Sequence, residues 1–156
     1  MPKAVTYPTQ SKLLERSRQH LVKFARDNGI ALRQNYNRQA PRMAAQVGRY
    51  AHARQFRRMR KTLKALQVRV GRVHREVARN VSALSQQVQS QARDLLESTG
   101  RILTQKSKDK NKLYALHAPE VECISKGKAR TPYEFGVKVS ASPVQKTHQN
   151  QRRLCQ

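Results

Sequence analysis

The amino-acid sequence predicts a mainly α-helical protein with a small β part, in which long basic amphipathic helices precede a short pair of strands. Apolar residues recur every three or four positions between residues 56 and 88, and the same spacing continues to residue 102 with Gln91 and Ser98 at two of its positions, which is the spacing of one face of a helix. After residue 110, apolar and polar residues alternate instead, which is typical of strands. Only 37% of the 156 residues are hydrophobic, so we expect a small core and disfavour a self-sufficient globular enzyme.

Residues 1–9 are expected to form a flexible arm, and a helix is expected over residues 10–28. Two of the first eight residues are prolines, which remove backbone donors and disfavour helix in the residue before them. Thr9 is a suitable N-cap residue for the helix. After a run of apolar residues at helical spacing, Asn28 and Gly29 form a stop signal.

A second helical pattern begins near Ile30 and meets Pro41, which either starts a new helix in its first turn or kinks an existing one. An apolar seam of period 3.5 then predicts a long helix, or an antiparallel pair of helices, over roughly residues 42–103, with a stutter after Val81. Residues 10–106 are thus expected to be a helical basic region with a coiled-coil-like seam. The first half of the seam consists of Phe56, Met59, Leu63, Leu66, Val70, Val73 and Val77.

The seam permits two interpretations. An amphipathic helix that packs on a neighbour is favoured over a free coiled coil, because the flanking positions lack complementary charges. Pairing with a second copy of the chain stays open, although the charges do not specify it. Tyr36, Tyr50 and Phe56 could stack on bases, but their spacing favours use in the core.

Residues 107–140 are expected to contain short strands, and residues 141–156 a disordered tail with almost no apolar content. The alternation from Tyr133 to Val139 predicts a half-buried strand. Shorter strands are expected at Leu113–Leu116 and at Val121–Ile124.

The charge balance favours a nucleic acid over an anionic membrane surface as the partner. The chain has 33 Lys and Arg against 9 Asp and Glu, a formal net charge of +24, and no apolar stretch of the about 18 residues that would cross a membrane. Between residues 49 and 79 the sequence has eleven Lys and Arg residues and one acidic residue, Glu76. A segment with charge of almost one sign predicts binding to DNA phosphates. The candidate DNA-binding residues are Arg49, Arg54, Arg57, Arg58, Arg60, Lys61, Lys64, Arg69, Arg72, Arg75 and Arg79.

Catalytic and metal sites are not expected. The nine carboxylates are scattered, the five histidines show no paired spacing, and neither Cys123 nor Cys155 has the spacing of a metal ligand. Glu120 and Glu122 share a face of an expected strand and could hold a cation, but a solvated strand edge is the favoured interpretation. We therefore assign no catalytic residue, no metal ligand and no cofactor.

Several short motifs are spread over roughly residues 3–140. They are Tyr7-Pro8-Thr9 with Ser11-Lys12-Leu13-Leu14, Leu32-Arg33-Gln34-Asn35-Tyr36, Arg49-Tyr50-Ala51-His52-Ala53-Arg54-Gln55-Phe56, Leu113 to Ile124, Gly127-Lys128-Ala129, and Pro132 to Val139. With these motifs the chain resembles an internal piece of a bacterial insertion-sequence transposase of the DDE class. The block over residues 113–139 is the most specific part of the resemblance.

This resemblance implies DNA transposition by a fold similar to ribonuclease H, on which three acidic residues hold two Mg²⁺ ions for strand cleavage and joining. In the family the first acid lies just before the stretch that begins here at Met1, and the other two lie beyond the stretch that ends here at Ser140. We therefore expect a truncated transposase, an incomplete piece of a ribonuclease H-like transposase domain, that retains DNA binding and lacks the catalytic acids.

The expected partner is the phosphate backbone of DNA, with a second copy of the chain or an intact transposase as a further partner, and no membrane. The N-terminus lacks the apolar stretch of a signal peptide, so we expect the bacterial cytoplasm, in association with the nucleoid. Two alternatives stay open. One is a stand-alone basic DNA-binding or nucleoid-associated helical protein, and the other is a regulator of an intact transposase.

Overall fold

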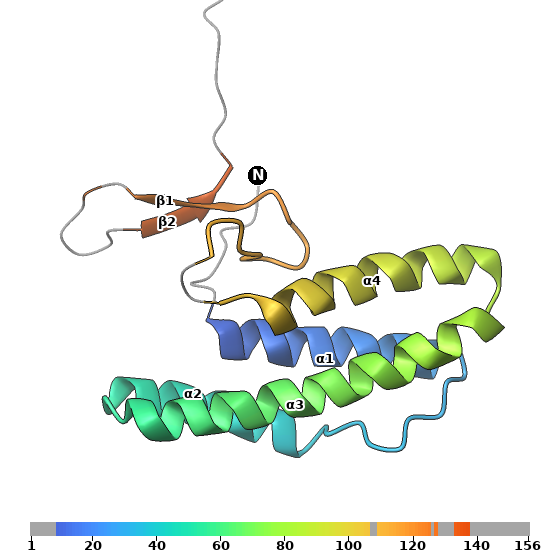
Figure 1. Cartoon of the computed structure of the whole chain (residues 1–156), viewed down its shortest axis with the longest axis horizontal. Helices are drawn as coiled ribbons and strands as arrows, with labels where there is room; N and C mark the ends of the chain where they lie inside the picture. Colours follow the sequence, from blue (N-terminus) through green and yellow to red (C-terminus); the bar gives the residue numbers. More distant parts are fainter. Residues whose placement is uncertain (1–8, 107–108, 126, 128–132, 138–156) are drawn as a thin grey trace, which may run out of the picture.

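The computed structural model describes residues 9–106, 109–125, 127 and 133–137, and in these residues four long helices accompany a two-stranded antiparallel sheet. The sheet lies beside the end of the helical bundle where α1 begins and α4 ends (Figure 1). The predicted class, mainly helical with a small β part, is confirmed. The elements are α1 (Gln10–Asp27), α2 (Gln39–His52), α3 (Phe56–Asn80), the 3₁₀ turn η1 (Val81–Ala83), α4 (Gln86–Thr104), β1 (Glu122–Ser125) and β2 (Tyr133–Gly136).

α3 packs against α1, α2 and α4, and α1 likewise contacts each of the other three long helices. Its buried seam residues divide between two apolar clusters along its length. The first cluster contains Leu13, Leu14, Ala40, Leu66, Val70, Ile102 and Leu113, and the second contains Leu21, Ala25, Val73 and Val77. The seam therefore serves packing within the chain, which is the interpretation the sequence favoured.

α1 ends in a turn that depends on a glycine. Gly29 has a φ of +68°, in the left-handed region that residues with a Cβ atom adopt at a cost. Its N–H donates to the carbonyl of Arg26 (3.3 Å), and the N–H of Ile30 donates to the carbonyl of Ala25 (2.8 Å). These two bonds form a Schellman motif, which satisfies carbonyls that the helix end would leave unpaired.

The predictions for the first two helices are confirmed in part. The helix expected over residues 10–28 is α1. The helical pattern expected from Ile30 is wrong, since residues 28–38 form an irregular connection whose apolar side chains pack on the second cluster. Pro41 lies in the first turn of α2, where its missing N–H costs no helical bond, so it starts a helix and does not kink one.

The region expected as one long helix or an antiparallel pair contains three helices. α2 stops at His52, and α3 begins at Phe56. α3 then ends near the predicted stutter, and η1 with an extended Ser85 turns the chain so that α4 runs back along the bundle (Figure 1). The antiparallel alternative is therefore correct for α3 and α4, whereas α2 is a separate helix.

The strand predictions are confirmed for two of three segments. Cys123 of β1 pairs with Phe135 of β2, whose ring centroid lies 5.1 Å from that of Tyr114. Leu113–Leu116 is not a strand, because Leu113 is buried in the first helical cluster and exchanges backbone hydrogen bonds with the Gln105 side chain. The face of β2 expected to be buried is half-exposed, since Tyr133 is 53% exposed.

Some predictions fall on parts of the chain that the structure does not describe. The expected arm, apart from Thr9, and the expected tail over residues 141–156 lie outside the described residues. The same holds for the last residues of the strand expected to reach Val139.

Candidate nucleic-acid interface

Cations gather on α3, at the turn that precedes it and on the last turn of α2. Seven of the predicted residues are exposed there, and none of them forms an ion pair with another described residue. The chain has no acid at all between Asp27 and Glu76. We call this group the basic corner; it consists of Arg49, Arg54, Arg57, Arg58, Arg60, Lys61 and Lys64.

The turn from α2 to α3 repeats the geometry that ends α1, with different residues. The N–H of Arg54 donates to the carbonyl of Ala51 (3.1 Å), and the N–H of Gln55 donates to the carbonyl of Tyr50 (2.9 Å). This is again a Schellman motif, but Arg54 stands where α1 has a glycine and adopts a φ of +55°. An arginine thus occupies a left-handed position that favours glycine.

Phe56 corrects a prediction at the same corner. The sequence favoured a place in the core, but this first residue of α3 is 51% exposed and lies among the cations. The seam extends one turn beyond the part of α3 that neighbouring helices cover. Tyr36 and Tyr50, in contrast, are half-buried, as the core interpretation expects.

Arg69 differs from the other predicted cations, because it is held against the protein. Its guanidinium donates to the side-chain carbonyl of Gln39 (3.1 Å) and to the backbone carbonyl of Ala65 (3.0 Å), and it lies 5.9 Å from the centroid of the Tyr36 ring. These contacts tie α3 to the start of α2. Arg69 therefore stabilises the bundle, whereas the other predicted cations of α3 are exposed.

The last three predicted cations border a hollow of about 540 Å³ between α3 and the connection over residues 28–38. Arg72 donates to the hydroxyl of Tyr36 (3.4 Å), and Arg79 donates through Nε to the backbone carbonyl of Arg75 (3.3 Å). The sequence did not single out Arg33, which also lines the hollow. The full lining is Arg33, Gln34, Tyr36, Arg72, Arg75, Glu76 and Arg79.

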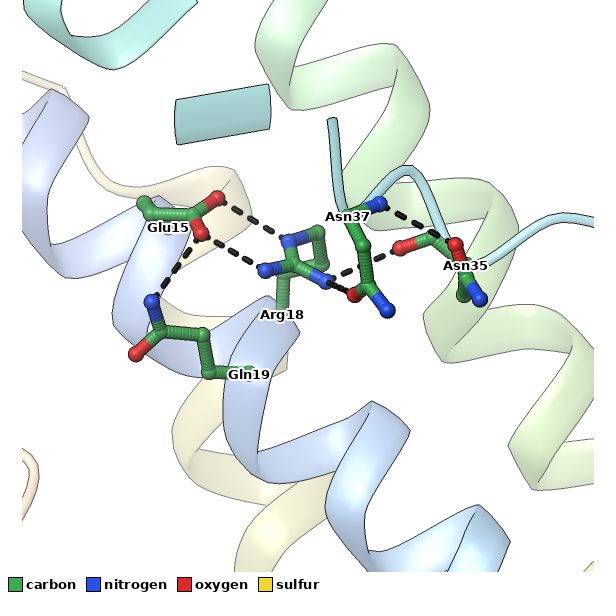
Figure 2. Close-up of polar contacts among 5 residues, drawn as sticks. All are labelled: Glu15, Arg18, Gln19, Asn35 and Asn37. Atoms are coloured by element: carbon green, nitrogen blue, oxygen red, sulfur yellow. Dashed lines mark hydrogen bonds and ion pairs between the residues drawn. The ribbon is translucent and has the colours of Figure 1, made fainter. Parts of the chain in front are cut away.

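A buried ion pair holds the connection that carries Arg33 and Tyr36. Arg18 of α1, only 3% exposed, makes two hydrogen bonds to the Glu15 carboxylate (2.6 and 3.0 Å; Figure 2). Its remaining amino group donates to the carbonyl of Asn35 (2.9 Å) and to the side chain of Asn37 (2.6 Å). A guanidinium with so many partners fixes the path of this connection.

Sequence reasoning missed both Arg33 and Arg18, because neither lies in the long basic run. For Arg18 the spacing of Glu15 and Arg18 on one helix face was an available signal, since residues three apart are neighbours. For Arg33 the available signal in the sequence was its place in the Leu32–Tyr36 motif.

The described residues contain no group of three His, Cys, Asp or Glu side chains that could hold a metal ion. Glu120 precedes β1, and both it and Glu122 are exposed, which agrees with the solvated edge that the sequence favoured. Within the part of the chain that is described, no helix combines the length and apolarity needed to cross a membrane.

Among the described residues, His20 and Tyr114 have shifted pKa values. Burial lowers the pKa of His20 below 6.5, and the neighbouring charges of Arg16 and Lys23 lower it further. Burial raises the pKa of Tyr114 above 10.0, and proximity to Cys123 adds to this shift.

The fold and the surface together define a small helical protein with an extended cationic face. A comparison with protein families gives no match, and neither does a comparison with solved structures. The chain is 53% identical over 55 residues to a Rhizobium meliloti protein named "Uncharacterized protein ORF8 in nfe locus". The similar stretch is 35% of this chain and about a quarter of the length of that relative (27%).

Proposed function

We propose that this chain binds duplex DNA through its phosphates at the basic corner, and that the binding serves transposition of an insertion sequence. The observation that carries the DNA-binding part is the group of seven exposed cations without an acid partner among the described residues. Solvated helix faces ordinarily carry both signs of charge. Like charges on one face repel one another, and a polyanion that binds there and neutralises them removes this repulsion.

The geometry of α3 suits a phosphate backbone. Arg57, Lys61 and Lys64 follow one another at four and three residues, so they lie on one face and span about 10 Å along the helix. Such a row can neutralise several phosphates of one strand. Contacts of this kind position a protein on DNA and release counterions, but they do not read the base sequence.

The conformation of Arg54 supports a role in binding. A residue with a Cβ atom in the left-handed region costs roughly 1–2 kcal/mol compared with the right-handed one, and α1 avoids this cost with Gly29. In a Schellman motif the residue after the left-handed position usually makes an apolar contact. Ile30 makes such a contact after α1, whereas the corresponding residue after α2 is the exposed Gln55. Strained positions of this kind concentrate at functional sites.

The transposition part of the proposal rests on the resemblance to DDE transposases. Under this proposal the helices and the β1–β2 hairpin belong to a ribonuclease H-like transposase, and the protein acts on the bacterial nucleoid. The family's chemistry uses Mg²⁺ held by three acids. The described residues of this chain do not fit such a site, because no three metal-ligating side chains gather in them, so we derive no metal-dependent step.

Titration of a fluorescent duplex with the purified chain at several salt concentrations tests the DNA-binding part. If about six phosphates are contacted, the logarithm of the affinity should fall with the logarithm of the salt concentration with a slope of about −5. Replacing Arg57, Arg58, Arg60 and Lys61 with Gln should reduce the slope to about −2. A flat salt response would refute the proposal.

The matched control removes the same number of exposed cations from α1 and α4. Lys12, Lys23, Arg93 and Arg101 are exposed on these two helices, and their replacement with Gln lowers the net charge by the same four units. If both quadruple variants lose the same affinity, overall charge explains the binding and the basic corner has no special role.

A further inference from the structure

The hollow beside the second half of α3 differs from the basic corner in shape and composition. The cations of the basic corner are exposed individually on a turn and a helix face, whereas Arg33, Arg72, Arg75 and Arg79 line one concavity of about 540 Å³. These four guanidinium groups share the hollow with one carboxylate, Glu76. The lining therefore carries a formal charge of +3.

The walls of the hollow are held in place by bonds between the connection and α3. The backbone N–H of Arg33 donates to Oε1 of Glu76 (2.9 Å), so the one carboxylate positions Arg33. The Tyr36 hydroxyl accepts a hydrogen bond from Arg72, and the buried Arg18 holds the carbonyl of Asn35. The connection therefore faces the arginines of α3 in a fixed arrangement.

Gly71 also contributes to the arrangement of the arginines. A Cβ atom at this buried helical position would lie 3.3 Å from one guanidinium nitrogen of Arg75. The absence of a side chain lets the Arg75 guanidinium lie against the helix at this edge of the hollow.

A compact anion with at least two charges fits this composition. An internal phosphodiester carries one negative charge, which would leave most of the +3 charge uncompensated. A terminal phosphate carries about −1.5 to −2 at pH 7 and offers three strong acceptor oxygens. Guanidinium groups bind such oxygens through paired, charge-assisted hydrogen bonds.

We propose that the hollow formed by Arg33, Arg72, Arg75 and Arg79 is a binding site for a terminal phosphate group. The group comes either from the phosphorylated end of a nucleic-acid strand or from a free phosphate anion. The strand-end source rests on the proposed DNA binding, whereas binding of a free anion does not.

The first experiment titrates the full chain with pyrophosphate by calorimetry, with sodium chloride at matched ionic strength as the reference. We expect saturable binding of one equivalent. The double variant R75Q/R79Q should weaken it by about tenfold or more, because each guanidinium contributes charge-assisted bonds. The control R93Q/R101Q removes two exposed cations of α4, outside both the hollow and the basic corner, and should change the affinity less than about twofold.

Both variants change exposed side chains, and thermal unfolding in chloride verifies that they fold like the original chain. If pyrophosphate shows no saturable binding beyond chloride, or if both double variants weaken it equally, the proposed site is refuted. That outcome would leave the salt-dependent binding of duplex DNA at the basic corner unaffected.

The second experiment distinguishes the two sources of the phosphate. Duplexes with 5′-phosphate and 5′-hydroxyl ends are compared in the same titration, with and without pyrophosphate as a competitor. If the phosphorylated duplex binds more tightly, and if both the R75Q/R79Q substitutions and added pyrophosphate abolish this difference, the result supports the strand end as the source of the phosphate. Equal binding of the two duplexes, together with saturable pyrophosphate binding, supports the free anion.

Discussion

Replacing Arg54 with Gly is expected to stabilise the protein and to weaken its binding to DNA. Arg54 has a φ of +55° in a turn whose counterpart after α1 uses Gly29. Relief of the left-handed conformation gains roughly 1–2 kcal/mol, and the greater freedom of glycine in the unfolded chain offsets about 0.5–1 kcal/mol of this gain. The net stabilisation of about 1 kcal/mol corresponds to an increase in Tm of about 2–4 °C for a chain of this size.

The loss of binding follows from the missing cation. If Arg54 contacts one phosphate, the salt slope should become less steep by about 0.9, and the affinity at moderate salt should fall by about three- to tenfold. Thermal unfolding by circular dichroism and DNA titration by fluorescence anisotropy measure the two effects on the same preparation.

Arg54→Ala is the matched control, because it removes the same cation but keeps the Cβ atom. It should lose as much affinity as the glycine variant without the rise in Tm. A glycine variant with unchanged affinity and slope would refute a binding role for Arg54. A fall in its Tm would show that the left-handed conformation does not cost the protein stability.

Three further predictions concern the helical bundle. Thr99→Val should raise the free energy of unfolding by about 1 kcal/mol in urea titrations, because the buried Thr99 hydroxyl has no hydrogen-bond partner among the described residues. A lower free energy of unfolding would indicate that this hydroxyl has a partner outside the described residues. Arg18→Ala should lower the free energy of unfolding by about 3–5 kcal/mol, since it leaves the Glu15 carboxylate buried without its cation, and a loss below about 1 kcal/mol would contradict this reasoning. The pKa of His20 is lowered in the folded state, so the stability that this residue contributes is present above pH 6.5 and is lost as the pH falls through the folded pKa. The H20Q variant should lack this part of the pH dependence of the free energy of unfolding. An NMR titration that gives His20 a pKa above 6.5 would contradict the sign of this effect.

The helices could be predicted from the sequence where local signals agree. α1 combines apolar residues at helical spacing with Asn28 and Gly29 at its end, and the structure follows both signals. The stutter after Val81 likewise coincides with the break between α3 and α4. These features depend on residues close together in the chain, which is where periodicity is informative.

The rest depended on contacts between distant residues. Leu113 and its neighbours have the composition of a strand, but burial against the helices outweighs that preference. The exposure of Phe56 could not be predicted from the sequence. Periodicity shows which face of the helix carries this side chain, but it does not show where the neighbouring helices that would cover that face end. The hollow places Arg33 of the connection over residues 28–38 in the same lining as Arg72 of α3, and no local pattern in the sequence indicates that two such distant residues come together.

The packing of α3 against the other three long helices couples the stability of the bundle to its surroundings. One side of this helix supplies residues to both apolar clusters, and the other side carries closely spaced positive charges from Arg57 to Arg79, a distance of about 33 Å. Repulsion along the outer side opposes the association that the inner side favours. Counterions or a bound polyanion that reduce this repulsion are therefore expected to stabilise the whole bundle, beyond the face that they contact.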